Sequence, residues 1–337
     1  MDSKAQKCDL SHGSSFDLVW LIGCLVICWL LFKILRSLWR GLYSCILANL
    51  FGATVNWKKL GKWAVITGST DGIGKAYAKA LAAKGFDIVL VSRNPEKLED
   101  VAQEIEKSYK VKTKVVAIDF TADSSIYDSV KREIEGLEVG VLVNNVGMSY
   151  LYAEYLTKIP DAEKFIENVL RANITSCLRM SLLVLPQMEQ RRKGVVINVS
   201  SLSAISPVPL LSIYSASKVF VNFFSKATAE EYKAKGIIVQ SVLPGFVSTK
   251  MSKMRPSFTT CTPEAFVKWA LKTVGVETQT FGYPVHKLQG FVQEIMSEYL
   301  PESMNLAINH RMMNNIRIRY YKKFGLKDTE RDSLKEK

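Results

Sequence analysis

From Trp63 to Leu243 the chain alternates short apolar runs with longer helical stretches, and this alternation limits the possible folds more than any other feature. Short, continuously apolar runs bounded by turn residues predict strands that are buried on both faces. The predicted strands are residues 63–67, 88–92, 114–118, 139–144, 195–200 and 237–243. The helices predicted between and after them are residues 73–84, 95–109, 124–135, 161–190 and 213–235. This order indicates an α/β fold, a single Rossmann-type doubly wound parallel sheet that binds its ligand at the carboxyl ends of the strands.

A long apolar run precedes this region. Residues 16–35 read FDLVWLIGCLVICWLLFKIL, with Asp17 and Lys33 as the only charged residues, which is close to the ~20 apolar residues that span a bilayer. A cleaved signal peptide is the alternative, but bulky residues continue where a small-residue cleavage site would stand. We therefore expect an uncleaved transmembrane helix. Lys33, Arg36 and Arg40 at its end predict, by the positive-inside rule, that the rest of the chain faces the cytosol.

The ends of the chain differ in composition from its middle. We expect an N-terminal tail at 1–15, the transmembrane anchor at 16–35, an amphipathic or interfacial linker at 36–60, an α/β domain at 61–280 and a helical, basic C-terminal extension at 281–337. A second apolar stretch, residues 42–55, is too short and too polar to span a membrane comfortably. The net charge is +13, and no nucleic-acid recognition motif accompanies it. The six cysteines lack metal-ligand spacing, so no metal site is expected.

The C-terminal extension concentrates basic residues among aromatic ones. These basic residues are Arg311, Arg317, Arg319, Lys322 and Lys323. A solvated helix face is one interpretation of the cluster. The other is contact with anionic lipid, since the anchor would already hold the domain near a membrane.

The first strand runs directly into a glycine-rich turn, TGSTDGIG at residues 67–74, and a helix begins there. Glycines let the backbone turn tightly and approach a pyrophosphate, which the helix N-terminus stabilises. The position between a buried strand and a helix favours dinucleotide binding, although the spacing is Gly-x-x-x-Gly-x-Gly rather than Gly-x-Gly-x-x-Gly. The residues expected to bind the cofactor here are Gly68, Ser69, Thr70, Asp71, Gly72, Ile73 and Gly74.

The end of the second predicted strand indicates which nicotinamide cofactor is used. An acidic residue at this place would bind the ribose 2′-hydroxyl and repel a 2′-phosphate. This chain has Ser92-Arg93-Asn94 instead, and Lys75 follows the glycine turn. Arg93 can form paired hydrogen bonds with a phosphate, although it could also be an ordinary surface arginine. We expect NADPH/NADP+ rather than NADH.

Tyr214 and Lys218 stand four residues apart in a predicted helix, on the same helix face. A lysine held beside a tyrosine favours the phenolate and lowers a pKa that is normally near 10. Such a phenol can act as a general acid near neutral pH. By itself the spacing is a weak signal, because similar pairs arise by chance on exposed helices.

The combination of the glycine turn, Asn144-Asn145-Val146-Gly147, Ser201 and Tyr214-x-x-x-Lys218 resembles the classical short-chain dehydrogenase/reductases. The similarity runs from about Gly61 to Thr280, with Val146 at a position where the family usually has alanine. Together with the N-terminal anchor it resembles the membrane-bound branch. That branch contains the 17β-hydroxysteroid dehydrogenases of types 3 and 12, the latter also being the very-long-chain 3-oxoacyl-CoA reductase.

This resemblance implies roles for individual residues. Tyr214 would donate a proton to the substrate ketone, Lys218 would lower its pKa and hold the nicotinamide ribose, and Ser201 would hydrogen-bond the carbonyl oxygen. Asn173 matches an asparagine that kinks the long helix and holds a water in a proton relay, although a purely structural role is also open. Further cofactor contacts are implied for Asp119, Asn144, Gly147, Val247 and Thr249.

The leading hypothesis is an endoplasmic-reticulum ketone reductase that uses NADPH to reduce a steroid 17- or 20-keto group to the β-alcohol. The rival is the 3-oxoacyl-CoA reductase of fatty-acid elongation. The tail at residues 333–337, which lacks a dilysine pattern, and the region after Met251, which departs from the branch, lean toward a steroid. A non-catalytic nucleotide-binding scaffold is the third hypothesis, and the intact Ser201, Tyr214 and Lys218 argue against it.

Two further expectations concern surfaces. In this family, helices such as 161–190 and 213–235 often form dimer faces, so a homodimer is expected. Apolar residues that could line either lipid pocket, or simply pack in the core, are Met148, Tyr150, Pro207, Leu211 and Phe246.

Overall fold

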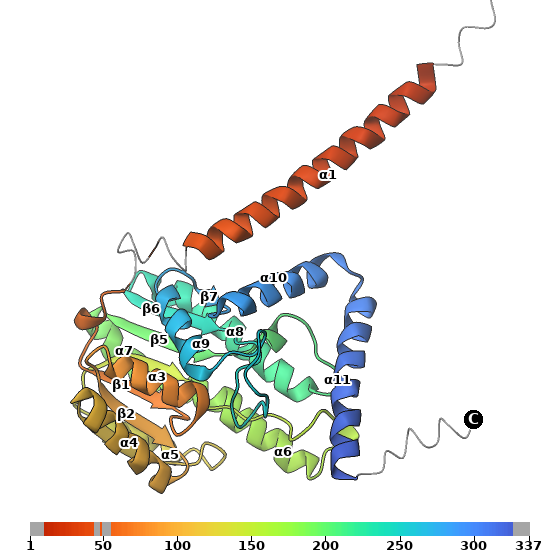
Figure 1. Ribbon diagram of the computed structural model, residues 1–337. Coiled ribbons are helices and arrows are strands. Elements are labelled where there is room, and N and C mark those ends of the chain that lie inside the picture. The colour runs from red at the N-terminus through yellow and green to blue at the C-terminus, as the bar shows by residue number, and fades with distance from the viewer. Residues whose placement is uncertain (1–9, 44–47, 49–54, 326–337) are drawn as a thin grey trace, which may run out of the picture. The chain divides into compact units, whose positions relative to one another are not determined.

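The computed structural model describes residues 10–43, 48 and 55–325, and the chain divides into two compact units, one up to Phe51 and one from Gly52 onward (Figure 1). The first unit contains α1 (Leu10–Leu42), which is longer than the anchor predicted at 16–35. Its section from Asp17 to Arg36 is long and apolar enough to cross a membrane, and none of it is buried. The predicted interfacial stretch at 42–55 lies almost wholly outside the described residues.

The second unit is built on one seven-stranded parallel sheet with the order β3-β2-β1-β4-β5-β6-β7. The strands are β1 (Trp63–Thr67), β2 (Asp87–Ser92), β3 (Thr113–Ala117), β4 (Val139–Asn144), β5 (Gly194–Val199), β6 (Ile237–Val242) and β7 (Gln279–Thr280). Six of them match the predicted strands to within one residue. The seventh, β7, was not predicted, because two residues at a sheet edge carry no apolar run. The doubly wound fold expected from the sequence is confirmed.

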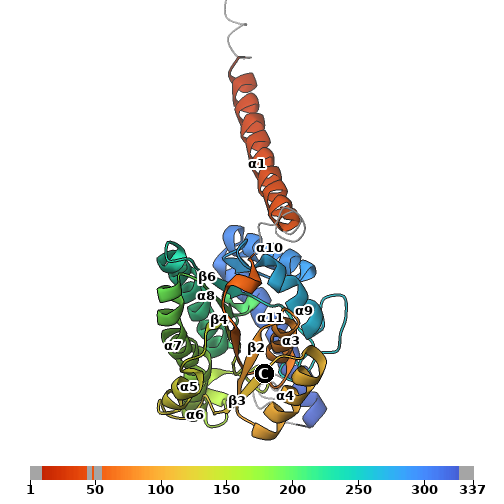
Figure 2. The ribbon, with the colours of Figure 1, turned by 90° about the vertical axis from the view of Figure 1, so that its left-hand side faces the viewer.

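Helices cover both faces of this sheet. They are α3 (Gly72–Ala82), α4 (Pro95–Tyr109), α5 (Ile126–Ile134), α6 (Ala162–Val169), α7 (Ser176–Arg191), α8 (Ser212–Lys233) and α9 (Pro263–Ala270). Figure 2 shows α3, α4 and α9 on one side of the sheet and α5, α7 and α8 on the other. Successive strand side chains point to opposite faces, so Ile66 packs in the apolar cluster with Tyr77 and Phe266, whereas Val65 packs in the other with Met180.

The long helix predicted at 161–190 is interrupted. Between α6 and α7 lies the π-helical segment η4 (Leu170–Thr175), which contains Asn173. Single π-turns inside α-helices are frequent at functional sites. The helical stretch predicted at 161–190 is therefore present, and its π-helical segment contains the residue for which the family resemblance implied a kink. The short helical turns elsewhere are η2 (Trp57–Lys59), η3 (Leu156–Lys158), η5 (Leu202–Ala204) and η6 (Leu271–Thr273).

The C-terminal extension is helical, as expected, and forms α10 (Pro284–Tyr299) and α11 (Glu302–Phe324). Arg317 of α11 is not part of an exposed basic cluster, which corrects the expectation from the sequence. Its Nε donates to Glu154 Oε1 at 2.8 Å, and both side chains are buried. Its guanidinium lies against the rings of Tyr155 and Tyr321, and the Tyr321 hydroxyl donates to the other Glu154 oxygen. This buried pair fastens α11 to the loop after β4.

Candidate active site

The glycine turn connects β1 to α3 in a conformation that needs its glycines. Gly68 and Gly72 have φ of +64° and +53°, in the left-handed region that favours glycine. A Cβ on Gly74 would lie 2.2 Å from the Gly68 carbonyl oxygen, so only glycine lets the helix start this close to the turn. Asp71 caps α3, since its Oδ1 accepts from the Gly72 amide at 2.7 Å. The turn thus presents a helix N-terminus at the carboxyl end of β1.

A cleft of about 560 Å³ opens along this turn and the neighbouring strand ends. The site residues predicted from the sequence that line it are Gly68, Thr70, Asp71, Gly72, Ile73, Arg93, Asp119, Gly147, Tyr214, Lys218 and Thr249. Lining residues that the sequence reasoning missed are Asn145, Val146, Asn168 and Met251, among others. Asn145 and Val146 belong to the motif Asn144-Asn145-Val146-Gly147, so their position in that motif was the available signal.

Four predicted cofactor residues do not line this cleft. Gly74 and Ser69 lie behind the turn, where the Ser69 hydroxyl reaches the Val91 carbonyl at 3.5 Å. Asn144 is turned into the core, where its amide donates to Asn198 Oδ1 at 2.8 Å and to Ser181 Oγ at 3.2 Å. Val247 is buried and forms an isolated bridge with Cys261. These four residues lie behind the residues that line the cleft and support their positions.

Asn145 takes the place expected for Asn144. Its side-chain amide donates to the Thr67 carbonyl at 3.0 Å and to the Gly68 carbonyl at 3.2 Å. These bonds tie the end of β4 to the glycine turn of β1. Because Asn144 and Asn145 are consecutive at a strand end, the pleat alone decides which one faces the core.

Arg93 lies at the rim of the cleft, with most of its side chain exposed and its Nη1 3.7 Å from Asp119 Oδ2. Burial would raise the pKa of Asp119, but hydrogen bonds from Thr121 and the charge of Arg93 outweigh burial and lower it. Asp119 is therefore a carboxylate at neutral pH. Lys75, which follows the glycine turn, pairs with Glu104 of α4 at 2.8 Å. Of Arg93 and Lys75, Arg93 is therefore the candidate cation for binding a 2′-phosphate.

Tyr214 and Lys218 stand on the first turns of α8 and face the cleft. Lys218 Nζ donates to the Val199 carbonyl at 3.0 Å and lies 5.7 Å from the centre of the Tyr214 ring. Burial lowers the pKa of Lys218 to about 8. Enclosure by protein raises the pKa of Tyr214, and a hydrogen bond with Ser201 opposes that rise.

The direction of the Tyr214 shift corrects the expectation from the sequence. Lys218 was expected to lower the pKa of Tyr214, but burial of the phenol is the largest influence on it, and the net pKa is raised. The phenol therefore stays protonated at neutral pH. A protonated phenol is the form that can donate a proton to a ketone oxygen.

Ser201 and Ser200 have different surroundings, although they are adjacent in the sequence. The Ser201 hydroxyl accepts from the Ser203 amide at 3.1 Å and hydrogen-bonds Tyr214. The Ser200 hydroxyl is buried and donates to the Lys218 carbonyl at 2.7 Å. The structure therefore brings together Ser201, Tyr214 and Lys218, and Ser200 supports the helix that carries the last two.

Asn173 uses its whole side chain to hold the loop after β4. Its Oδ1 accepts from the Met148 amide at 2.6 Å, and its Nδ2 donates to the Met148 carbonyl at 3.0 Å and to Ser217 Oγ at 2.8 Å. Gly147 lets this loop pass closely, since a Cβ there would lie 3.3 Å from Lys218 Nζ. These contacts give Asn173 a structural role, and its part in a proton relay stays a prediction.

The apolar residues proposed for a substrate pocket have different locations. Met148 lines the cleft, and the Tyr150 hydroxyl accepts from the Ile213 amide at 3.2 Å, next to Tyr214. Leu211 packs in a small cluster with Met313 of α11. Pro207 is exposed, and its carbonyl accepts a hydrogen bond from Asn309 of α11. Phe246 is 45% exposed. The extension is therefore attached to the chain segment that joins Ser201 to Tyr214.

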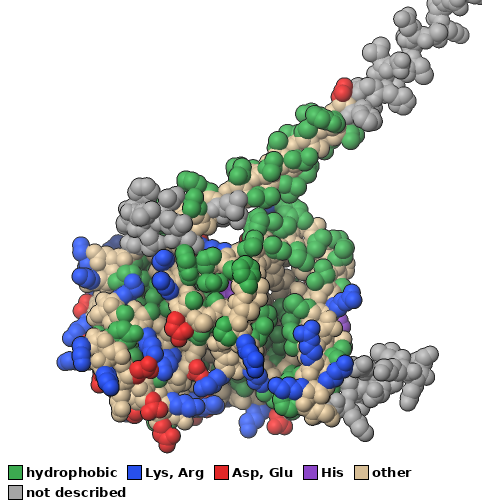
Figure 3. Space-filling view, viewed as in Figure 1, with side chains coloured by type: hydrophobic (Ala, Val, Ile, Leu, Met, Phe, Trp, Pro, Cys, Tyr) green, Lys and Arg blue, Asp and Glu red, His purple; other side chains and the backbone are tan. Residues whose placement is uncertain are grey.

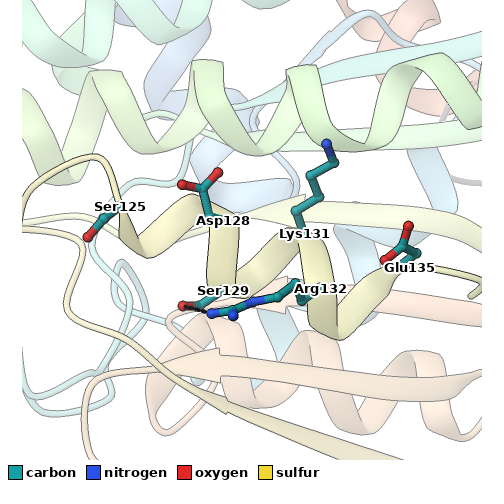
Figure 4. Close-up of a pocket in the computed structure, with 6 residues that line it drawn as sticks. All are labelled: Ser125, Asp128, Ser129, Lys131, Arg132 and Glu135. Atoms are coloured by element: carbon teal, nitrogen blue, oxygen red, sulfur yellow. Dashed lines mark hydrogen bonds between the residues drawn. The ribbon is translucent and has the colours of Figure 1, made fainter.

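A second hollow lies along α5 (Figure 4). The residues that line it come from α5 and its two ends: Ser125, Asp128, Ser129, Lys131, Arg132 and Glu135. Figure 4 shows them along the outside of the helix, with Arg132 Nη2 donating to Ser129 Oγ at 3.2 Å. Because one exposed helix supplies the lining, this hollow is a solvated helix face.

The parallel sheet, the glycine turn and the grouping of Ser201, Tyr214 and Lys218 define a dinucleotide-dependent oxidoreductase. Residues 62–259 match the family model described as short chain dehydrogenase. The chain therefore belongs to the short-chain dehydrogenase/reductase family, and it is a ketone reductase of that family.

Several relatives cover most of this chain. The very-long-chain 3-oxoacyl-CoA reductase of Bos taurus is 51% identical over 268 residues, which is 79% of this chain and 84% of that protein. Very-long-chain 3-oxoacyl-CoA reductase-B of Danio rerio is 47% identical over 308 residues, 91% of this chain and 97% of that protein. The Homo sapiens enzyme of the same name is 51% identical over 265 residues, 78% of this chain and 83% of that protein.

Solved structures are similar at lower identity. A 7β-hydroxysteroid dehydrogenase matches with a TM-score of 0.68 and 27% identity, covering 75% of this chain and 98% of that one. A short-chain dehydrogenase from Sphingobium yanoikuyae, solved in complex with NADPH, matches with a TM-score of 0.57 and 28% identity, covering 62% and 83%.

Proposed function

We propose that this protein is a membrane-anchored, NADPH-dependent very-long-chain 3-oxoacyl-CoA reductase. The observation that carries the proposal is the 47% identity with a reductase of that name across 91% of the chain, well beyond the matched family region. The steroid 17- or 20-keto reductase favoured by the sequence becomes the second candidate. The relatives outweigh the two features that favoured it, and residues 333–337 lie outside the described part of the chain.

The residues of the cleft fit a nicotinamide dinucleotide. A Cβ on Gly72 would lie 2.9 Å from the Thr249 side chain, so the glycine keeps the space between them open. The N-terminus of α3 offers backbone amides to phosphate. Arg93 at the rim suits a 2′-phosphate, which supports NADPH over NADH. When bound, the cofactor supplies the hydride that reduces the carbonyl carbon.

The chain's own groups supply the proton and the positioning. The raised pKa of Tyr214 keeps its phenol protonated, so it can donate a proton to the ketone oxygen. Ser201 hydrogen-bonds Tyr214 and can also stabilise negative charge on that oxygen. Lys218 is held by the Val199 carbonyl beside Gly147, where it can hold a ribose hydroxyl.

The substrate test uses the full chain in microsomes with NADPH. We expect the wild type to turn over a long-chain 3-oxoacyl-CoA. The Tyr214→Phe variant is the matched control and is expected to be inactive. Turnover of 17- or 20-keto steroids alone would overturn the proposal in favour of the second candidate. Equal turnover of every substrate by Tyr214→Phe would reject the assigned catalytic residues, and no turnover of either class would favour the non-catalytic scaffold.

The cofactor test uses Arg93→Asp. The new carboxylate should repel a 2′-phosphate and accept a ribose hydroxyl, so the ratio of kcat/KM for NADPH to that for NADH should fall by at least about tenfold. Arg132→Asp on α5 makes the same change of charge outside the cleft and should leave the ratio unchanged. An unchanged ratio in Arg93→Asp would remove the argument for NADPH.

The helix α1 supports an anchor in the endoplasmic-reticulum membrane with the catalytic domain in the cytosol. Lys33, Arg36 and Arg40 near its C-terminal end are the basis for this orientation. Protease added to intact microsomes should therefore digest the domain and spare α1. Protection of the whole domain would place it in the lumen.

Exposed apolar side chains on α7 and α8 support a homodimer. Leu182, Phe220 and Phe223 are all exposed there, which is typical of a contact surface. We expect a dimer by light scattering in detergent and a monomer for Leu182→Glu/Phe223→Glu. A wild-type monomer would contradict this part of the proposal.

A further inference from the structure

The helices α10 and α11 leave an apolar face exposed in the described part of the chain. We call this face the apolar ridge. It consists of Leu288, Val292 and Tyr299 on α10 and Met304, Ile308, Met312 and Ile316 on α11. The four residues on α11 follow each other at intervals of four, so they form one continuous row. Figure 3 shows hydrophobic side chains gathered over α10, whereas charged side chains dominate over α3 and α4.

The inner face of α11 is more polar than this outer row. Its buried residues are Asn305, Asn309, Met313 and Arg317. Asn309 donates to Ser206 and Pro207, and Arg317 pairs with Glu154. A surface helix of a water-soluble domain normally has the opposite pattern, with its apolar stripe inside and polar residues outside. The exposed side of α11 carries this apolar row beside a second row that contains Arg311 and Arg319, and an apolar row flanked by cations fits a membrane interface.

Charged residues beside the ridge suit an anionic lipid surface. The exposed cations of α11 are Arg311, Arg319, Lys322 and Lys323. Glu302 at the start of the helix is its only carboxylate. Cations next to an apolar helix face favour binding in the interface of an anionic membrane.

One loop adjoins both α11 and the cleft. Met251 lines the cleft, and its loop also exposes Met254 and Phe258. The same loop contacts α11, because Lys253 Nζ lies 5.9 Å from the centre of the Tyr320 ring. The loop that contains Met251 and Lys253 therefore adjoins both the cleft and α11.

The chain itself restricts how far the domain can lie from a membrane. Only residues 43–56 separate α1 from η2, and fourteen residues span at most about 50 Å even when fully extended. If α1 is inserted, the domain surface is therefore always close to the bilayer. A weak contact would become effective because of this high local concentration.

We propose that the apolar ridge of α10 and α11 lies on the bilayer surface as a second membrane contact, so that a lipid substrate enters the cleft from the membrane. The inference rests on the proposed anchoring by α1. It adds a binding surface, and it accounts for the apolar outer row of α11.

The test uses the full chain in nanodiscs that contain a phospholipid with a photoactivatable diazirine in its acyl chain. Mass spectrometry of the cross-linked peptides then shows which helices contact lipid. We expect label in α1, in α10 and in α11, with more label in α11 when phosphatidylserine is included, and none in α4 or α5. Ile308→Gln/Met312→Gln should lower the α11 label about tenfold. Leu156→Gln in η3 makes the same kind of change at another exposed apolar position and should not alter it.

Each outcome has a defined meaning. Label in α1 without label in α10 and α11 overturns the ridge contact and leaves the anchor intact. Absence of label from α1 overturns the anchoring, and this inference with it.

A kinetic readout separates docking from catalysis. In proteoliposomes the Ile308→Gln/Met312→Gln variant should have a raised KM for a long-chain 3-oxoacyl-CoA and an unchanged kcat. Its KM for a short-chain, water-soluble 3-oxoacyl-CoA and its affinity for NADPH should equal those of the wild type. Equal KM values of variant and wild type for the long-chain substrate would contradict delivery from the membrane.

Discussion

Replacing Arg317 by methionine tests how the C-terminal extension is held. In the wild type the Arg317 guanidinium donates to Glu154 at 2.8 Å and lies between the rings of Tyr155 and Tyr321. Methionine keeps much of the volume but removes the charge. Glu154 is then left as a buried carboxylate whose partner is gone, which is the costly case for buried ion pairs.

The expected loss in the free energy of unfolding follows from the contacts that Arg317→Met removes. A hydrogen bond to a charged group contributes about 1.5–3 kcal/mol, and cation–π contacts with two rings contribute about 1–2 kcal/mol more. The sum agrees with the ~3–5 kcal/mol found when one partner of a buried pair is removed. For a domain of this size, that corresponds to a fall of about 6–20 °C in the thermal midpoint.

The assay is thermal unfolding of the full chain in detergent, followed by circular dichroism. The double variant Glu154→Gln/Arg317→Met removes both charges and should recover most of the loss, since no unpaired charge remains. The matched control is Lys233→Met, which breaks the exposed pair with Glu230 and should shift the midpoint by about 1–3 °C at most. A midpoint of Arg317→Met equal to that of the wild type would refute the reasoning, as would a double variant no more stable than Arg317→Met.

Three further predictions concern the active site. Tyr214→Phe should lower kcat by about 10²–10⁴ while the affinity for NADPH, measured by fluorescence titration, stays the same; a larger effect on affinity than on kcat would assign Tyr214 to binding. The pKa of Lys218 is lowered to about 8, so between about pH 8 and 10.5 the unfolded chain binds a proton that the folded chain lacks, and stability should rise with pH. Compared with Lys218→Met in urea unfolding, the wild type should gain about 2 kcal/mol from pH 7.5 to 9.5; a constant difference would contradict the lowered pKa of the buried lysine. Gly74→Ala should destabilise by about 1–3 kcal/mol and weaken NADPH binding, because its Cβ would meet the Gly68 carbonyl, whereas Gly85→Ala, with open space around it, should cost about 1 kcal/mol for its positive φ and leave binding unchanged.

Much of the fold follows from the sequence, because its signals are local. Six strands of the sheet are continuous apolar runs, and their bounds were predicted to within one residue. β7 was missed because two residues carry no period. The helix predicted at 161–190 contains a π-helical segment, since a wide turn at Asn173 depends on contacts with Met148 and Ser217 from distant parts of the chain.

The candidate site was predicted in part for the same reason. The glycine turn, Tyr214 and Lys218 were identified because motif spacing carries their geometry. Asn144 was expected in the cleft, where the structure places Asn145 instead. This difference arises because a motif gives the order of residues and not the direction in which each side chain points.

The sequence by itself determined the parallel sheet, the apolar N-terminal helix and the set of residues from which the site is built. Each of these depends on the spacing of apolar residues or on the steric properties of single residues. Both can be recognised from residues that are close together in the sequence. Only the tertiary structure decided that the pKa of Tyr214 is raised and that Arg317 is buried with Glu154. It also decided that α11 exposes its apolar row. Glu154 and Arg317 are 163 positions apart in the sequence, so no local pattern could reveal that they pair.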